Sequence, residues 1–401
     1  MSTAPITKAS ASDDDDIWSG LKIIDTDTHI SEPHDLWTSR APSRYRDDVP
    51  HFVEKDGTSS WILNDVVIGG ATASAVVGSN GEKELGTGFF RMGIDDVHAA
   101  CYETKARVQM MDTLGIHAQI VYPNLAGFGG QNFMKASDEQ LRLVCVQIYN
   151  DAMAEMQAES GERLFPMAVM PWWNAEQMAA EARRCAAMGL RGVVTCSNPH
   201  DAGTPDLSDA IWNPFWETCC ELSLSINFHI GSSESVMGWF GRTPWPSFDQ
   251  EQKLSIASSN LFLGNAQVIG NLIYGGVPER FPQAKFVSVE SGIGWIPFFL
   301  EALDHQMGET APSLAAKLSL TPTEYFHRQF LACFWFERVA IDRLLDIIGV
   351  NNVMFETDFP HPTCLYPKSN ERVRATMAGL DHATRKRIVQ DNAAELYRIP
   401  V

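Results

Sequence analysis

The segment IIDTDTHISEP, residues 23–33, decides the fold and the site that we expect for this chain. Apolar and β-branched residues lead into Asp25, Asp27 and His29, so a buried strand carries acidic and imidazole side chains at alternate positions. Residues two apart on a strand project from the same face of a sheet, so Asp27 and His29 can bind one ion together. Imidazole nitrogen and carboxylate oxygen suit Zn²⁺ or Mn²⁺. Alone, this pattern is a weak signal that needs partners elsewhere in the chain.

Seven more apolar segments follow, and amphipathic segments separate them. We expect strands at 22–30, 117–123, 164–171, 192–197, 225–232, 285–291, 332–337 and 353–360. Helices are expected at 104–114, 137–159, 175–188, 213–224, 341–348 and 380–399, where apolar residues recur every three or four positions. Eight strands that alternate with helices, without a Rossmann glycine fingerprint, predict an α/β protein with a (β/α)8 TIM barrel.

One interval departs from this alternation, between the first strand and the helix at 104–114. Residues 31–103 include HFVEKDGTSSWILNDVVIGG (51–70), where polar and apolar residues alternate around Asp56-Gly57 and predict a β-hairpin. A long insertion at the carboxyl end of the first strand would lie over the barrel mouth, so we expect 31–103 to cap it. We expect residues 21–401 to form one metal-dependent domain, preceded by a disordered acidic tail at 1–20.

The composition narrows the class of protein. The 401 residues include 31 Lys and Arg against 50 Asp and Glu, and the net charge of −19 argues against a nucleic-acid partner. The amino-terminal residues lack the apolar segment of a secretory signal. The sequence also contains no run of about 18 apolar residues, so we expect no membrane span. Eight scattered cysteines without a Cys-X-X-Cys pair indicate reduced thiols in a cytoplasmic protein.

Polar side chains stand at the carboxyl ends of four expected strands, where barrel enzymes hold their catalytic groups. The fifth strand contributes His229, the sixth Glu290, and the eighth Asp358 with His361 three residues later. Together with the first strand, they would supply the three or four ligands of a catalytic metal. Each has a structural alternative: His229 as a core histidine, and Glu290 or Asp358 as helix caps or partners of buried arginines. Their joint recurrence favours the metal site.

Several longer stretches resemble the amidohydrolase superfamily, and within it the amidohydrolase-2 group, typified by aminocarboxymuconate-semialdehyde decarboxylase. The stretches are IIDTDTHISEP, WNPFWETCCELSLSINFHIG, KFVSVESGIGWIPFFLEALD, VMFETDFPHP and IVQDNAAELYRI. The resemblance covers most of residues 22–399 and implies a barrel with one divalent metal ion, zinc first and manganese second. It also implies a homodimer, because members of the group are often dimers.

The resemblance implies a particular set of ligands. Asp27 and His29 look like the group's first-strand His-X-His or Glu-X-His, while His229 and Asp358 resemble its fifth-strand histidine and eighth-strand aspartate. We therefore expect these four residues to hold the metal. GVVTCSNP (192–199) has no counterpart of the lysine that bridges two metals in dinuclear members, which favours a mononuclear site. Glu290 stands where the group has a sixth-strand histidine, and it could act as acid or base, bind the metal or orient a ligand.

The function implied by the resemblance is metal-dependent, non-oxidative decarboxylation of an aromatic or conjugated carboxylic acid. We expect Asp358, Glu290 and His229 to be catalytic, with Asp358 or Glu290 giving a proton to the carbon that loses CO₂. Two alternatives stay open. The same residues could hydrolyse an amide, ester or lactone, or the barrel could bind a ligand without catalysis.

Contacts to a small-molecule substrate are expected near the strand ends. Aromatic side chains there could clamp a planar substrate, although packing between barrel and helices explains the tryptophans equally well. Cationic groups could meet the substrate carboxylate, but surface pairing or support between helices is the favoured interpretation for the arginines. The expected contacts are Trp172, Trp173, Trp295, His361 and Arg91, with Arg107 as a further candidate. GFGGQN (127–132) lacks the spacing and the lysine of a phosphate loop, and it predicts a rim loop.

Overall fold

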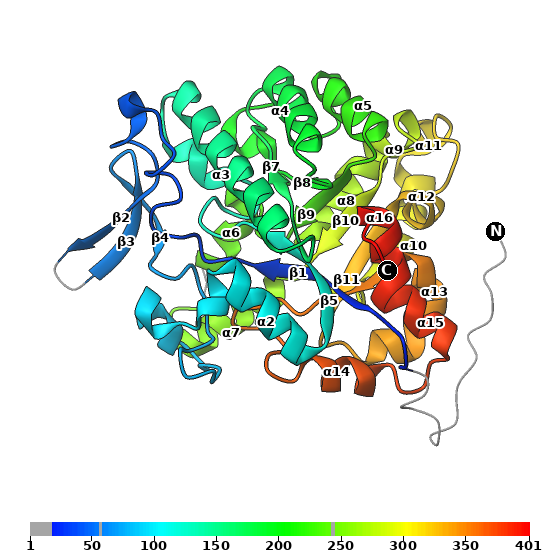
Figure 1. The fold of residues 1–401 in the computed structure, drawn as a ribbon. Helices are drawn as coiled ribbons and strands as arrows, with labels where there is room; N and C mark the ends of the chain where they lie inside the picture. The colour runs from blue at the N-terminus through cyan, green and yellow to red at the C-terminus, as the bar shows by residue number, and fades with distance from the viewer. Residues whose placement is uncertain (1–17, 56–57, 242–244) are drawn as a thin grey trace.

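The computed structural model describes residues 18–55, 58–241 and 245–401, and it shows a mixed α/β fold, as predicted (Figure 1). The acidic tail predicted at 1–20 lies outside the described residues as far as residue 17. The Asp56-Gly57 turn of the predicted hairpin also lies outside them.

Parallel strands occupy all eight predicted positions. They form one sheet of order β1-β5-β6 and a second of order β12-β11-β10-β9-β8-β7, so strands that follow one another in the chain are neighbours. Their residues are buried almost throughout, as expected for parallel strands that helices cover. The strands are β1 (Ile23–His29), β5 (Ile116–Tyr122), β6 (Leu164–Pro166), β7 (Ala168–Val169), β8 (Gly192–Val194), β9 (Ser225–His229), β10 (Phe286–Val289), β11 (Phe330–Phe334) and β12 (Val353–Phe355).

The two parallel sheets adjoin at both edges. Only Met167 separates β6 from β7, and its N–H donates to Val121 O (2.9 Å). At the other edge Thr28 forms a parallel bridge with Phe359, next to β12. The strand predicted at 353–360 ends at Phe355, because the residues after it turn toward β1. The carboxyl end of β1 therefore lies beside the segment that follows β12.

Helices stand outside the parallel strands in Figure 1. The predicted helices are present with small shifts, although the one predicted at 380–399 is divided by a π-helical turn at Arg387–Asp391. None of the helices in the described part of the chain is long and apolar enough to cross a membrane. The helices are α2 (Thr104–Leu114), α3 (Glu139–Glu159), α4 (Ala175–Ala187), α5 (Asn213–Glu221), α6 (Glu234–Gly241), α7 (Gln250–Leu261), α8 (Asn265–Tyr274), α9 (Val277–Arg280), α10 (Ile296–Thr310), α11 (Pro312–Ala315), α12 (Pro322–Gln329), α13 (Leu345–Ile348), α14 (Ser369–Thr376), α15 (His382–Lys386) and α16 (Asn392–Tyr397).

Residues 31–103 contain an antiparallel sheet of β2 (His51–Lys55), β3 (Thr58–Leu63) and β4 (Val66–Gly70). The pairing of β2 with β3 agrees with the predicted hairpin. In Figure 1 this sheet stands at one edge of the molecule, on the opposite side from α15 and α16. A second small core within 75–101 packs against Phe359 and Cys364, and Val76 N donates to Pro360 O (2.9 Å). The segment is thus anchored on the chain that follows β12.

The eight cysteines are all free thiols, and only Cys220 among them is partly exposed. Burial raises the pKa of the Cys101 thiol to about 12. These thiols pack in the interior and form no disulfide framework.

Candidate metal centre

The carboxyl end of β1 places Asp27 and His29 in the interior, where both side chains are fully buried. Backbone hydrogen bonds fix this end, because His29 N donates to Phe359 O (2.7 Å) and Asp358 N donates to Asp27 O (2.9 Å). Arg107 donates from Nη2 to His29 O (2.5 Å) and from Nε to Ala100 O (2.6 Å). Arg107 is therefore a buried support of the β1 backbone, which favours the structural interpretation of this residue over a contact with a substrate carboxylate.

His229 and Glu290 come from adjacent strand ends. His229 closes β9 in register with Val289 of β10, so Glu290 is the next residue beyond this pair. The backbone N–H of Glu290 donates to Glu356 Oε2 (3.2 Å). Glu290 has φ 51° and Asp358 has φ 60°, a left-handed conformation that residues other than glycine adopt rarely. Such backbone strain is common at functional sites, and here it directs both carboxylates toward the histidines.

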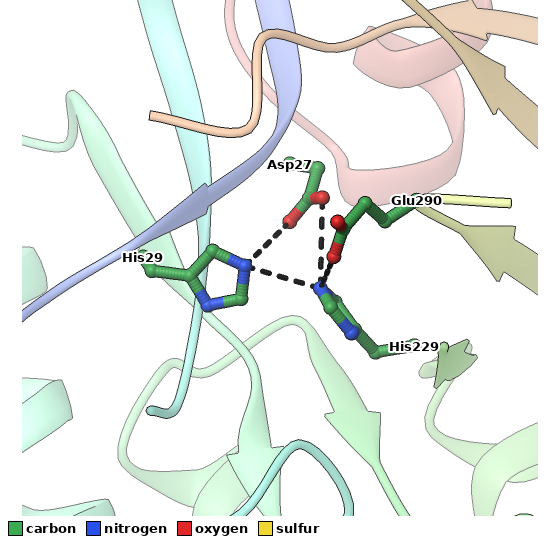
Figure 2. A group of neighbouring side chains, drawn as sticks. All are labelled: Asp27, His29, His229 and Glu290. Atoms are coloured by element: carbon green, nitrogen blue, oxygen red, sulfur yellow. Dashed lines mark hydrogen bonds and ion pairs between the residues drawn. The ribbon is translucent and has the colours of Figure 1, made fainter. Parts of the chain in front are cut away.

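Figure 2 shows four of these side chains converging from three strand ends. The Nε2 atoms of His29 and His229 are 3.1 Å apart. Asp27 places Oδ1 3.6 Å from His29 Nε2 and Oδ2 3.6 Å from His229 Nε2. Glu290 Oε2 lies 3.1 Å from His229 Nε2. One ligand atom from each of the four residues lies within 4.8 Å of the others, which is close enough to share one ion.

The hydrogen bonds of the two imidazoles favour a cation between them. His229 Nδ1 is 2.8 Å from Ile230 O, and His29 Nδ1 is 3.3 Å from Pro123 O. A carbonyl oxygen only accepts, so each Nδ1 carries the proton and each Nε2 presents a lone pair. Both oxygens of Asp27 are buried without a hydrogen-bond partner. Two facing lone pairs and an unpaired carboxylate would repel one another, and a divalent cation would satisfy all of them.

The electrostatics of the cluster agree with this donor set. Burial lowers the pKa of His29 and lowers that of His229 to about 4, so both imidazoles are neutral at pH 7, the form in which histidine can bind a metal. Burial, followed by the charges of Asp358 and Asp25, raises the pKa of Asp27. Burial, followed by the charges of Asp358 and Asp27, also raises the pKa of Glu290. A bound cation would offset this crowding of acids.

Asp358 and His361 extend the cluster on one side. Asp358 Oδ1 lies 3.7 Å from His29 Nε2 and 3.2 Å from His361 Nδ1, and Thr363 Oγ1 donates to Asp358 Oδ2. The His361 ring stacks on His29 with centroids 3.8 Å apart. His361 Nε2 is 2.6 Å from Asn124 Oδ1. The predicted ligands and His361 thus lie together at one place in the fold.

Four further residues lie at the site that the sequence analysis did not predict as site residues, although it noted Asp25 in the alternating pattern of the first strand. Asp25 accepts hydrogen bonds from Thr357 N (2.8 Å) and Oγ1 (2.6 Å), and burial raises its pKa to about 7. Glu356 is fully buried, and burial and the charge of Asp27 raise its pKa. Both acids alternate with predicted ligands, in DTD and ETD, so the period of two could have revealed them.

The third and fourth missed residues lie in loops. Glu32 accepts from Asn124 N (3.0 Å) and Leu125 N (2.8 Å), and burial raises its pKa to about 7. Phe128, in the predicted rim loop, places its ring centroid 4.4 Å from that of His229. No sequence signal places either side chain, because each position depends on contacts between distant segments.

For the other predicted contacts, the structure shows packing or hydrogen bonds with residues outside the cluster. Trp172 is buried edge-on to Trp173, with centroids 6.1 Å apart, and the guanidinium of Arg142 lies 5.9 Å from the Trp173 ring centre. Trp295 donates from Nε1 to Ser291 O (2.8 Å). Arg91 is exposed at the end of a short 3-10 helix. Their roles as substrate contacts stay predictions.

The sequence around this cluster matches a known protein family. The family model described as Amidohydrolase matches residues 24–399. The chain belongs to the amidohydrolase family. The family predicted from the sequence is therefore confirmed, and the match takes in every residue of the cluster.

Two curated relatives are decarboxylases. This amidohydrolase is 24% identical over 312 residues to gamma-resorcylate decarboxylase of Rhodococcus jostii (strain RHA1), an alignment that covers 73% of this chain and 87% of the relative. It is 20% identical over 355 residues to 2-amino-3-carboxymuconate-6-semialdehyde decarboxylase of Caenorhabditis elegans, which covers 79% and 83% of the two chains.

Two solved structures share the fold. The amidohydrolase map2389c from Mycobacterium avium subsp. paratuberculosis K-10 superposes with a TM-score of 0.75 at 19% identity, covering 95% of this chain and 99% of that chain. The 5-carboxyvanillate decarboxylase of Novosphingobium aromaticivorans, complexed with manganese and 4-hydroxy-3-methoxy-5-nitrobenzoic acid, superposes with a TM-score of 0.65 at 15% identity, covering 99% and 100%.

Proposed function

We propose that this amidohydrolase is a metal-dependent decarboxylase that removes CO₂, without oxidation, from an aromatic or conjugated carboxylic acid. The observation that carries the proposal is the pair of Nε2 lone pairs of His29 and His229, 3.1 Å apart beside the unpaired oxygens of Asp27. The decarboxylases among its relatives support the reaction class.

We infer that the parallel strands close into a (β/α)8 barrel and that the cluster lies at its mouth. The two places where the sheets adjoin support closure, and each cluster residue lies near or just beyond the carboxyl end of a strand. We further propose that residues 31–103 cap this mouth within a single domain of residues 21–401. Their packing on Phe359 supports the cap, as does the hydrogen bond from Ser31 Oγ to Thr72 O (2.7 Å).

Asp27, His29 and His229 would hold one divalent ion, with Glu290 or Asp358 completing the set. When bound, the ion supplies a site for the substrate's carboxylate and a neighbouring oxygen, and it stabilises the negative charge that develops there. Zinc fits the imidazole and carboxylate donors. The manganese in the 5-carboxyvanillate decarboxylase structure supports manganese as the alternative.

We assign proton delivery to Asp358 first. Its Oδ2 accepts from Thr363, and its Oδ1 faces His361, which in turn contacts Asn124, so the carboxyl group is held in one orientation. The carbon–CO₂ bond breaks, and the proton from Asp358 goes to the carbon that keeps the electron pair. Glu290 stays the alternative donor, because its raised pKa favours the neutral acid that this step requires.

Hydrolysis of an amide, ester or lactone is the second candidate, since the family carries the description Amidohydrolase. The same acids would then accept and return the proton of a water molecule. Product analysis separates the two reactions, because decarboxylation releases CO₂ whereas hydrolysis yields two fragments with added water.

Metal analysis combined with a panel of hydroxybenzoic acids tests the proposal. We expect about one divalent ion per chain and CO₂ release from at least one acid. Asp358→Asn should keep the ion but lose activity by about 100-fold or more, as removal of a general acid does. The exposed Asp112, paired with Arg163, gives the matched control Asp112→Asn. A purified protein that takes up no divalent ion, or that forms only hydrolytic products, would overturn the proposal.

The homodimer and the cytoplasmic location inferred from the sequence stay proposals. Sedimentation of the purified protein tests the first, and fractionation of source cells tests the second.

A further inference from the structure

The loop that follows β5 carries an aromatic side chain to the cluster. The ring centroid of Phe128 lies 4.4 Å from that of His229, 5.3 Å from that of His29 and 5.8 Å from that of His361. Tyr122 also approaches His229, at 5.4 Å, but it is fully buried. Phe128 is half-buried, so the residue that brings its ring to the imidazoles is also partly exposed to solvent.

The backbone on both sides of Phe128 is held tightly. A Cβ at Gly129 would lie 2.6 Å from Ser232 O, and one at Gly130, where φ is +76°, would lie 2.6 Å from Val169 Cγ1. Gln131 donates from Nε2 to Gly231 O (2.8 Å) and accepts from Gly129 N at Oε1 (2.9 Å). The loop therefore presents the phenyl ring from a fixed position.

The side chains of the cluster differ in their exposure to solvent. The side chains of His29, His229 and Asp358 are fully buried, whereas those of Glu290 and His361 are 10% and 7% exposed. Glu290 and His361 are therefore the more exposed members of the cluster, and the Phe128 ring lies 5.8 Å from the His361 ring on that side.

We propose that Phe128 is a specificity-determining residue whose ring forms one wall of the substrate subsite and selects flat carbon skeletons. This inference rests on the proposed function, which brings a carboxylate to the cluster. A planar ring or conjugated chain stacks on a phenyl face at van der Waals distance, whereas a puckered saturated ring makes fewer contacts. The wall thus discriminates by shape, independently of the later chemical step.

The test measures binding to the cobalt(II)-loaded protein through the change in its visible spectrum. The two probes are benzoate and cyclohexanecarboxylate, which share a carboxylate and ring size but differ in planarity. We expect wild type to favour benzoate by about fivefold, in line with the typical strength of an aromatic pair. Phe128→Leu keeps an apolar side chain without a flat face and should bind both probes with nearly equal affinity. Phe128→Tyr should restore the preference.

Phe298→Ala is the matched control, because Phe298 on α10 is 76% exposed. It should leave the preference unchanged. Cobalt uptake by every variant checks that the cluster is intact. Equal affinities in wild type, or an unchanged preference in Phe128→Leu, would overturn the inference while leaving the proposed function in place. Failure of both probes to bind cobalt-loaded wild type would also overturn the inference, whereas the proposed function is overturned by the absence of metal uptake or of CO₂ release.

Discussion

Asp27 has both carboxylate oxygens buried without a hydrogen-bond partner. Without a cation, burial and the neighbouring acids oppose its charge. We expect Asp27→Asn to weaken metal binding by at least about tenfold. In chelator, the variant should be about 1 kcal/mol more stable than wild type, because a repelled buried carboxylate is gone. Metal titration and urea unfolding measure the two effects. An unchanged metal affinity would contradict the assignment.

Glu32 should make the stability of the metal-free protein depend on pH. Its pKa rises from 4.5 to about 7 on burial, so the folded state holds a proton that the unfolded state releases earlier. The stability from this proton is fully present below pH 4.5 and is lost as pH rises through 7. Glu32→Gln keeps an acceptor for the loop amides but cannot ionise. We expect it to flatten the fall in unfolding free energy between about pH 4.5 and pH 7, by up to about 1.4 kcal/mol per pH unit.

Urea unfolding of chelated protein across this pH range measures the slope. Glu155→Gln is the control, because Glu155 is 64% exposed in a surface pair with Arg40. Parallel profiles for wild type and Glu32→Gln would show that Glu32 is ionised in the folded protein.

The residues predicted as ligands lie together because one rule governs them all: parallel strands bring their carboxyl ends to one edge. That rule predicts from the sequence alone that Asp27, His29, His229 and Asp358 lie close together. It does not reach Phe128, whose position depends on a loop seated against Ser232 and Val169. It also left the role of Arg107 open, because nothing in the sequence shows that its guanidinium turns inward to His29 O.

At the scale of elements, the loop after β5 depends on the absence of a side chain at Gly129. A Cβ there would meet Ser232 O at 2.6 Å, and this backbone atom cannot move aside easily. We expect Gly129→Ala to cost about 1–3 kcal/mol, as overpacking does, and to shift the Phe128 ring away from the imidazoles. Urea unfolding gives the first quantity, and the benzoate preference of the cobalt protein gives the second.

Gly308→Ala is the matched control within α10. No atom lies within 4 Å of its added Cβ, and alanine favours a helix, so this variant should gain about 0.5–1 kcal/mol. Equal changes in unfolding free energy for the two substitutions would contradict close packing of the loop against Ser232.

Strand positions were predictable because short apolar runs alternate along the chain with amphipathic segments of helical period. The carboxyl ends of the strands were not predictable. The strand predicted at 353–360 ends at Phe355, because Asp358 N donates a hydrogen bond to Asp27 O in β1 instead. The helices α6 to α9 between β9 and β10 were missing from the prediction. In α7 only Ala257 and Leu261 are buried, so the segment lacks the apolar stripe that marks a helix in sequence.

At the scale of the whole molecule, one cation would join strands of both parallel sheets, because its donors come from β1, β9 and the segments after β10 and β12. We expect chelation to lower the unfolding temperature and metal to restore it. Free metal at about 100 times Kd adds about 2.7 kcal/mol when only the folded state binds. Calorimetry with EDTA, zinc and manganese measures this, and identical unfolding temperatures in all three would contradict a site formed on folding.

The contacts between β1 and the segment after β12 also determine at which point of protein synthesis the candidate metal centre can form. Thr357 reaches Asp25 across 332 residues of chain, so the first ligands leave the ribosome long before their last partners are made. We expect nascent chains arrested before residue 357 to hold no cation tightly, which metal analysis of stalled complexes would measure. Loading would then belong to the final stage of biogenesis, after translation has passed the eighth strand.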